Sequence, residues 1–343
     1  MCKHSQLLIA CFLFAASLCA QVPLDSPPLQ EARPALCSPG VINRAPAKGI
    51  SFTYSFNPDY VMRPVATEVA GKVRRNEFFD VRLRAPLYRS EKLKIILGFQ
   101  YTLERYHFNQ RSSENYPLFR HLDNTGLKNA GIAAMIVHPI NHRFYSSFRL
   151  SANWQGDYEQ FVNLGARYAV YRAAALLGFK KNEKLEYGVG VVASKDFQDV
   201  NFIPFGFYNQ TFNKHWGIEF TIPSSFKVRY NFSERSIAQL GTELNNQNYS
   251  MLLNPQTGQQ GLPHPVQRAP FNYQRSYFDI VGSYYQHLSG WAWVQLKLGY
   301  GININSRARD IPLRQDFDLR PSGAMVGMIS FFLSPPKNLL EGK

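Results

Sequence analysis

The sequence is short of cysteine and of long apolar runs. Its 343 residues include only four cysteines, and neither a CxxC nor an HExxH spacing occurs, so we predict no metal site. No internal run approaches the roughly 18 apolar residues of a transmembrane helix. The mean hydropathy of -0.27 also excludes a bundle of apolar helices. Gly188 and Gly190 are not followed by a helix that could bind phosphate, and we predict no cofactor.

The basic residues lack the clustering of a nucleic-acid-binding protein. The formal net charge is +14, but lysine and arginine are scattered singly and form no basic stripe on a helix. We therefore predict no nucleic-acid partner. Anionic lipid head groups and small anionic or polar solutes are the expected partners of such a charge.

The first twenty residues have the pattern of a secretory signal peptide. Lys3 precedes the apolar run Leu7–Ala16, and Leu18-Cys19-Ala20 follows it before Gln21. We expect cleavage after Ala20. Cleavage would leave Cys37 as the one cysteine of the exported chain, so no internal disulfide could form.

A strand-like alternation is clearest between Phe79 and Phe108. Apolar residues at 79, 81, 83, 85 and 87 alternate with Asp80, Arg82 and Arg84, and the return arm repeats the pattern. Each arm reaches the roughly 9 to 11 residues that a tilted strand needs to cross a bilayer. Strands of soluble proteins are usually near 5 to 6 residues. The length therefore favours lipid against the apolar face.

The alternation recurs along the chain and predicts about fourteen strands, with twelve as the fallback. The first is expected to end at Pro58, the second to begin near Phe79 after a polar connection, and the last to span 323–333. Tight joins near 90, 141, 182, 213, 233 and 289 would share one side, and long loops at 109–126 and 253–275 the other. Pro223-Ser224-Ser225 is interpreted as a short turn on the long-loop side.

These observations predict one fold class. Because lipid cannot satisfy an open strand edge, we expect an all-β, transmembrane, antiparallel, up-and-down β-barrel. It would span residues 49–334, after a signal peptide at 1–20 and a proline-rich periplasmic leader at 21–48, for which a flexible segment is favoured over a docking role. Residues 335–343 would form a short periplasmic tail.

Several short motifs support this prediction. They are Ala85-Pro86-Leu87, Gly98-Phe99-Gln100-Tyr101 with Glu104, Tyr187-Gly188-Val189-Gly190, and Asn213-Lys214-His215-Trp216 with Ile222-Pro223. Together they resemble an uncharacterised, porin-like family of Gram-negative outer-membrane β-barrels with only a domain-of-unknown-function label. The resemblance covers most of the chain after residue 49 and implies an outer-membrane location, reached by export and with the barrel-assembly machinery as a partner. It supplies no catalytic or binding residues.

The polar faces of the strands predict a charged lumen. Its candidate lining residues are Asp80, Arg82, Arg84, Lys94, Glu104, Arg149, Glu186, Glu219, Lys227, Arg229, Glu243, Asp279 and Lys297. One interpretation is a polar channel or transporter whose basic groups favour anionic solutes. The other is a structural or assembly barrel in which opposite charges pair and close the lumen. Sequence alone leaves both open.

Aromatic and histidine residues complete the analysis. Trp154, Trp216, Trp291 and Trp293 lie near predicted strand ends, as expected of the aromatic residues at a membrane interface. An outer-membrane lipid hydrolase is the less favoured alternative. His107, His121 and His287 carry no accompanying nucleophile motif, so no catalytic residues are predicted.

Overall fold

The computed structural model describes residues 36–65, 69–109, 116–159, 165–197, 199–253, 269–310 and 316–335. The predicted signal peptide, the first part of the leader and most of the predicted tail lie outside these residues.

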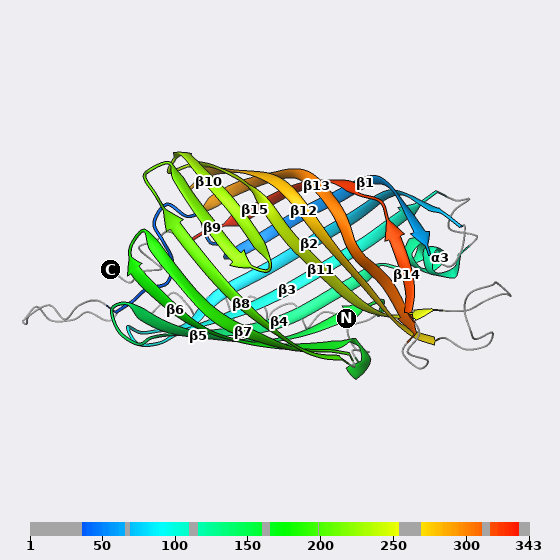
Figure 1. Cartoon of the computed structure of the whole chain (residues 1–343), viewed down its shortest axis with the longest axis horizontal. Coiled ribbons are helices and arrows are strands. Elements are labelled where there is room, and N and C mark those ends of the chain that lie inside the picture. The colour runs from blue at the N-terminus through cyan, green and yellow to red at the C-terminus, as the bar shows by residue number, and fades with distance from the viewer. Residues whose placement is uncertain are drawn as a thin grey trace, which may run out of the picture. The chain divides into compact units, whose positions relative to one another are not determined.

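Antiparallel strands make up most of the described chain (Figure 1). They are β1 (Ile50–Pro64), β2 (Gly71–Arg89), β3 (Lys94–Phe108), β4 (Leu127–Pro139), β5 (Phe144–Gly156), β6 (Ala169–Asn182), β7 (Leu185–Asp196), β8 (Asp199–Thr211), β9 (Trp216–Ile222), β10 (Ser225–Ser233), β11 (Ser236–Leu253), β12 (Ala269–Ser289), β13 (Ala292–Asp310), β14 (Asp316–Pro321) and β15 (Ala324–Leu333). The helical elements are α3 (Pro117–Asn124) and the 3-10 turn η2 (Ala166–Tyr168). Within the described ranges, no helix has the length and apolar character needed to cross a membrane.

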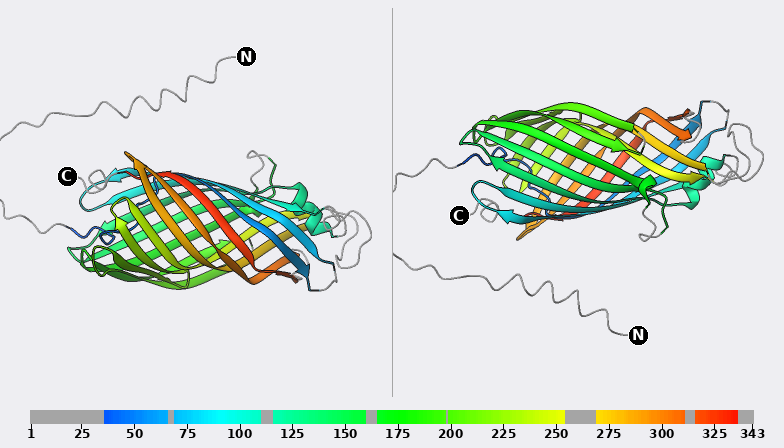
Figure 2. Two further views of the ribbon diagram at one scale, coloured as in Figure 1. Left: turned by 90° about the horizontal axis from the view of Figure 1, so that it is seen from above. Right: turned by 90° about the horizontal axis from the view of Figure 1, so that it is seen from below.

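The strands close into a barrel. Each strand from β1 to β13 pairs antiparallel with its sequence neighbour, and β14 and β15 both pair with β13 and β1 (Figure 2). Since β14 and β15 follow each other along one strand position, the barrel has 14 positions. The predicted barrel class and strand number are confirmed, as is the hairpin turn at Pro223-Ser224 between β9 and β10.

The two ends of the barrel differ. One end, called here the turn end, carries the short connections from β2 to β3, β4 to β5, β6 to β7, β8 to β9, β10 to β11 and β12 to β13. The opposite end carries α3 between β3 and β4 and is called the α3 end. All six tight joins expected from the sequence lie at the turn end.

Several strands extend further toward the α3 end than the sequence predicted. β1 continues through Pro58 to Pro64, β2 begins at Gly71, and β12 begins at Ala269 within a predicted loop. Pro58 is tolerated because it lies in a stretch of β1, residues 57–61, that has no ladder partner on the side of β14 and β15.

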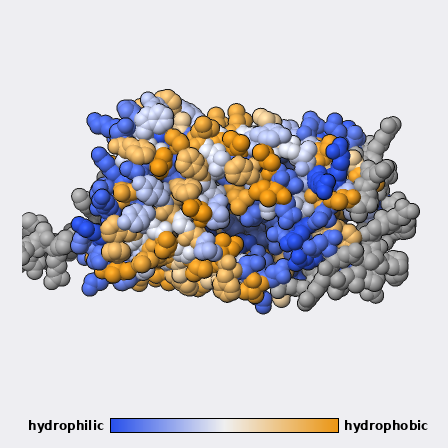
Figure 3. Space-filling view, viewed as in Figure 1, coloured by the Kyte–Doolittle hydropathy of each residue, from blue (hydrophilic) through white to orange (hydrophobic). Residues whose placement is uncertain are grey.

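Large apolar side chains cover the outside of the barrel. Leu240 and Leu298, for example, are 65% and 68% exposed, and Figure 3 shows hydrophobic residues spread over the middle of one face. Trp216 and Trp291 are exposed at the turn end. Trp293, expected at the interface, is instead buried, because β13 begins at Ala292 and its alternation turns residue 293 inward.

The α3 half of the lumen is filled by an apolar cluster. Phe119 of α3 is fully buried among side chains that include Phe108, Tyr273 and Met251. Packing is tight: a Cβ added to Gly71 would lie 2.6 Å from the Phe119 ring. We call this set of buried residues the α3-end cluster.

Candidate functional site

A polar cavity occupies the part of the lumen between the α3-end cluster and the turn end. Its volume is about 590 Å³. The charged residues of its lining are six basic and three acidic side chains, namely Lys48, Arg82, Arg172, Lys227, Arg275 and Lys297 with Asp80, Glu243 and Asp279. The lining therefore carries an excess of positive charge.

Arginines line one side of the lumen. Arg82 of β2 forms an ion pair with Asp80 at 2.8 Å, and its side chain remains 48% exposed. Arg84 and Arg149 share its inward parity and interact electrostatically with Arg82, and both are exposed. These three cations outnumber the one carboxylate beside them, so this side of the lumen carries a net positive charge.

The opposite side of the cavity holds a carboxylate between two lysines. Glu243 of β11 lies 2.8 Å from the Nζ of Lys227 and 2.7 Å from that of Lys297. Asp279 accepts a hydrogen bond from Asn245 at 2.6 Å. Two lysines and two carboxylates therefore balance on this side of the cavity.

A buried ion pair separates the cavity from the α3-end cluster. Arg275 of β12 is 4% exposed, and its Nη2 lies 2.6 Å from Oε1 of Glu104, which is fully buried. The same guanidinium donates to the Tyr106 hydroxyl at 2.7 Å and to Asn76 at 3.2 Å. These bonds compensate for burying the charges and set a boundary between polar and apolar lumen.

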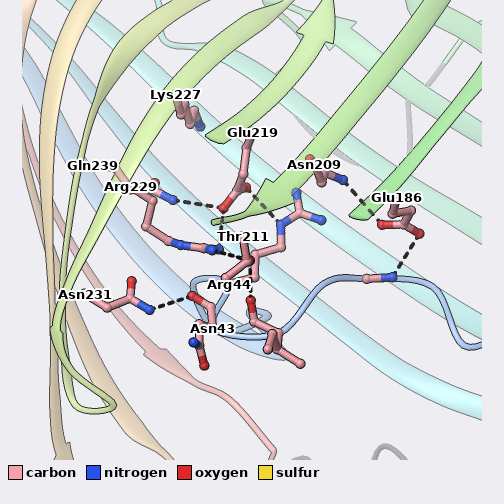
Figure 4. Close-up of polar contacts among 12 residues, drawn as sticks. Asn43, Arg44, Glu186, Asn209, Thr211, Glu219, Lys227, Arg229, Asn231 and Gln239 are labelled. Carbon is pink, nitrogen blue, oxygen red and sulfur yellow. Dashed lines mark hydrogen bonds and ion pairs between the residues drawn. The ribbon is translucent and has the colours of Figure 1, made fainter. Parts of the chain in front are cut away.

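Residues 36–49, called here the strap, cross the lumen at the turn end. Figure 4 shows the contacts: the Gly40 amide donates to Glu186 at 2.9 Å, and Arg44 lies 2.9 Å from Glu219. The carbonyls of Ile42 and Asn43 accept hydrogen bonds from the wall. The flexible leader expected from the sequence is thus docked over this part, because the wall supplies partners for its backbone.

The wall beneath the strap contains a buried arginine. Arg229 of β10 is fully buried, with its Nη1 3.2 Å from Glu219 and its Nη2 2.8 Å from the Thr211 hydroxyl. Glu219 therefore forms ion pairs with both Arg229 and Arg44 (Figure 4). This shared carboxylate ties the strap to the barrel wall.

Two further residues of the strap reach inward. Lys48 donates to Gln295 at 2.7 Å and to Ser330 at 3.1 Å, and burial followed by repulsion from Lys297 lowers the pKa of Lys48 to about 8. Cys37 is 3% exposed and packs with Val137 and Tyr145. Burial raises the pKa of the Cys37 thiol, so it is a poor nucleophile in the docked strap.

The barrel wall is interrupted beside the cavity. β9 and β10 have only 7 and 9 residues, so residues 199–205 of β8 lack a β9 partner and residues 244–253 of β11 lack a β10 partner. We call this interruption, above the turn at Pro223-Ser224, the side gap. Figure 3 shows a hollow with hydrophilic walls on this face of the molecule.

The cavity reaches the side gap. Asn246 and Asn248 line the cavity together with Gln247 and Tyr249, although successive residues of a strand point to opposite faces. Beyond the gap, Arg309 lies 3.0 Å from Asp199 at the start of β8, and Ser250 of β11 pairs with Gly156 of β5. Polar bridges thus border the gap on the side of the α3 end.

The structure brings together some predicted lumen residues and separates others. Asp80, Arg82, Lys227, Glu243, Asp279 and Lys297 line the cavity. Glu186, Glu219, Arg229 and Lys94 belong to the turn end, where Lys94 reaches Ser38 of the strap at 3.4 Å. Glu104 lies in the boundary layer. Arg84 and Arg149 lie on the arginine side.

Three important basic residues were missed in the sequence. Arg275 falls in a predicted loop because its inward neighbours Tyr273 and Phe271 are apolar, which reverses the expected polarity of the strand. Arg172 lies two residues from Ala174 in β6 and therefore on the same face of the strand, so counting the alternation along β6 could have identified it. Lys48 belongs to the strap, which has no periodicity to read.

The histidines considered for an enzyme have other contacts. The Nε2 of His121 lies 2.9 Å from Asp157, which also accepts hydrogen bonds from Tyr168 and from the Leu252 amide. His107 pairs with Glu77 at 3.0 Å on the outside. Among the described residues, no serine, threonine or cysteine side chain hydrogen-bonds to a histidine. The His121–Asp157 contact joins α3 to the ends of β5 and β11.

Comparisons with known proteins give the family. Residues 50–307 match the domain of unknown function DUF6268. The chain belongs to this family. No curated protein matches the sequence.

Solved structures with some likeness to the chain are bacterial proteins. A FadL homologue of Pseudomonas aeruginosa is 7% identical over 84% of this chain and 90% of that chain, with a TM-score of 0.41. The toluene transporter TodX of Pseudomonas putida is 10% identical over 88% and 91%, with a TM-score of 0.34. LpxR from Salmonella typhimurium is 9% identical over 82% and 100%, with a TM-score of 0.31. Scores this low carry no inference about what the chain binds.

Proposed function

We propose that this protein is an outer-membrane transporter of small anionic solutes. The membrane placement is supported by the closed barrel and its apolar outside, since a closed ladder is the only strand arrangement that lipid tolerates. Short turns face the periplasm in such barrels, so the turn end and the strap would be periplasmic and the α3 end would face outward. Cleavage after Ala20 stays a prediction, which sequencing the N-terminus of the exported protein would check.

The observation that carries the proposal is the cavity with its excess of basic side chains. A lumen that served only as structure would pair its charges, as Glu243 does with two lysines. Arg84 and Arg149 instead remain exposed to the lumen beside Arg82. Such a cluster of cations on one side of the lumen attracts and holds anions.

The side gap supplies a route for the solute. The α3-end cluster fills the axial path on one side, and the strap crosses it on the other. The side gap opens the cavity through the wall, where residues 199–205 of β8 and 245–249 of β11 lack a ladder partner and offer hydrogen bonds to a polar solute. A solute would thus enter or leave between β8 and β11.

Single-channel recording in planar bilayers tests the proposal. The full chain is expected to give small or rare current steps with anion preference in a potassium chloride gradient, and a variant lacking residues 36–48 larger ones. Replacing Arg82, Arg84 and Arg149 with glutamine should abolish the preference while the barrel still folds. Lys195→Gln, on the outward face of β7, is the matched control and should change nothing.

A structural barrel without transport is the second candidate. The filled α3 half of the lumen favours it, because a packed core of this kind stabilises a barrel and blocks axial flow. The absence of current steps with both the full chain and the strap-deleted variant would contradict the transporter proposal. It would leave the structural barrel as the better account.

A further inference from the structure

Four basic side chains on the outside of the barrel form a band at the α3 end. They are Arg63 of β1, Lys72 and Arg74 of β2, and Arg320 of β14, and all four are exposed. We call them the basic band. None of them has an ion-pair or side-chain hydrogen-bond partner among the described residues. Such unpaired charge on adjacent strands is unusual enough to need an explanation.

The strand alternation shows that the central pair points outward. Met62 and Pro64 are buried toward the lumen, so Arg63 between them faces away from it. Leu319 and Pro321 flank Arg320 in the same way. Arg63 and Arg320 are also directly opposite each other in the ladder of β1 and β14. Side chains in such a pair have Cβ atoms about 5 Å apart, where like charges destabilise the sheet.

Three other arginines at the same end have carboxylate partners within the protein. Arg309 of β13 lies 2.6 Å from Asp316, and Arg307 lies 3.3 Å from the same carboxylate. Glu77 of β2 pairs with Arg75 at 2.9 Å and with His107 of β3 at 3.0 Å, so its two oxygens already have partners outside the basic band. Arg75, Arg307 and Arg309 thus have carboxylate partners on this rim, whereas neither Arg63 nor Arg320 forms an ion pair within the described chain, although Asp318 shares the outward face of β14 with Arg320.

The position of the basic band identifies its partner. On the same strands, Phe52, Tyr54 and Phe79 are exposed nearer the turn end and belong to the apolar outside of the barrel. The polar contacts around Glu77 lie between these aromatics and the basic band. In a membrane this order is acyl chain, interface and head group, so the basic band lies at the height of lipid phosphates.

We propose that Arg63 and Arg320 bind the phosphate of an outer-leaflet lipid, with Lys72 and Arg74 contributing charge beside them. A guanidinium binds phosphate oxygens by two parallel hydrogen bonds, and two adjacent guanidinium groups suit one phosphate or a closely spaced pair. The bound phosphate supplies the missing counterion. This proposal depends on the barrel spanning a membrane, and it holds whether or not the lumen transports a solute.

The test measures how lipid changes the melting temperature of the purified full chain. Protein in a zwitterionic detergent is titrated with diphosphoryl lipid A, with lipid A stripped of phosphate, and with inorganic pyrophosphate, and unfolding is followed by gel mobility. Diphosphoryl lipid A is expected to raise the melting temperature saturably, because a ligand that binds only the folded state stabilises it. The other two probes should leave it unchanged.

The decisive variant is Arg63→Gln/Arg320→Gln. It should melt at a higher temperature than the wild type without lipid, because the repulsion is gone, yet bind diphosphoryl lipid A about 30-fold more weakly. A merely structural role would not move these two readouts in opposite directions. Arg63→Lys/Arg320→Lys keeps both charges but loses the paired guanidinium hydrogen bonds, so it should bind more weakly than the wild type and more tightly than Arg63→Gln/Arg320→Gln. Arg307→Gln/Arg309→Gln is the matched control on the same rim and should bind normally.

Three results would overturn the proposal. Unchanged lipid affinity in the Arg63→Gln/Arg320→Gln variant would show that the pair is not the site. Equal stabilisation by pyrophosphate would indicate a site for a soluble anion. Equal stabilisation by the stripped lipid would show that acyl contact alone is measured.

Discussion

The two halves of the lumen are built by the same strands and filled in opposite ways. Toward the α3 end, inward-facing positions carry Phe108, Tyr273 and Met251, which pack into an apolar core. Toward the turn end they carry Arg82, Glu243 and Lys297, which line a polar cavity. A strand ladder constrains which side chains face inward and says nothing of their polarity. A barrel can therefore combine a packed core and a solvated site along one lumen.

The boundary between the halves should be the most sensitive position. Arg275→Met would leave the buried carboxylate of Glu104 without its counterion, at a cost of about 3 to 5 kcal/mol in the free energy of unfolding. Urea unfolding in detergent micelles measures the loss. The double variant Glu104→Gln/Arg275→Met should recover most of it, and a double variant as unstable as the single one would contradict the ion-pair explanation.

A cavity made in the apolar half should come next. Phe119 is fully buried and its ring lies 5.2 Å from that of Phe108, so Phe119→Ala should cost about 3 to 4 kcal/mol. Equilibrium unfolding again supplies the measurement. Phe202→Ala is the control, because Phe202 is 71% exposed on the outside and its loss leaves no cavity. Similar losses from both would show that the α3-end cluster is not a packed core.

The contact that holds α3 over the lumen should be sensitive to pH. Burial opposes ionisation of Asp157, but hydrogen bonds from His121 and the Leu252 amide outweigh it and lower the pKa of Asp157. A lowered carboxyl pKa contributes stability above the unfolded value near 4, and that stability is lost as the pH falls through the folded value. Asp157→Asn should therefore cost about 1 to 3 kcal/mol at neutral pH.

The pH profile separates this effect from a general one. The wild type should lose its advantage over Asp157→Asn as the pH falls below about 4. Asp199→Asn, at an exposed carboxylate of the same end, is the control for acid sensitivity. An advantage of the wild type that stayed constant to pH 2 would refute the role given to this carboxylate.

The strap should give the smallest change in stability. Arg44 is about half exposed, so Arg44→Ala should cost no more than about 1 kcal/mol and release the strap more often. Maleimide labelling of Cys37, in a chain whose other cysteines are serine, reports this release because the docked thiol is buried. We expect labelling up to about fivefold faster. Lys214→Ala, exposed at the same end, should label like the parent, and unchanged labelling in Arg44→Ala would show that Arg44 does not hold the strap.

Local alternation predicted the barrel better than it predicted the contents of the lumen. β3 follows the expected pattern as far as Glu104, with Leu97 and Phe99 outside and Glu104 inside, and departs from it where Tyr106 and Phe108 turn inward. β12 departs from it, because Tyr273 and Tyr277 face inward around Arg275. Trp293 was also misplaced, although it has the parity of Gln295 and Lys297 and counting along β13 puts it on the lumen face. The polarity of a side chain therefore indicates whether it faces the lumen only where the lumen is lined by polar residues.

The sequence by itself determined that this chain forms a closed antiparallel barrel of about fourteen strands and which side chains of its regular hairpins share a face. It could do so because a period of two residues is a local property that the pleat of a strand enforces. Only the tertiary structure decided that Glu219 holds both Arg44 and Arg229, that β9 and β10 end early beside the cavity, and that Arg63 meets Arg320. These contacts join residues as far as 257 positions apart (Arg63 and Arg320), and they depend on how the barrel closes.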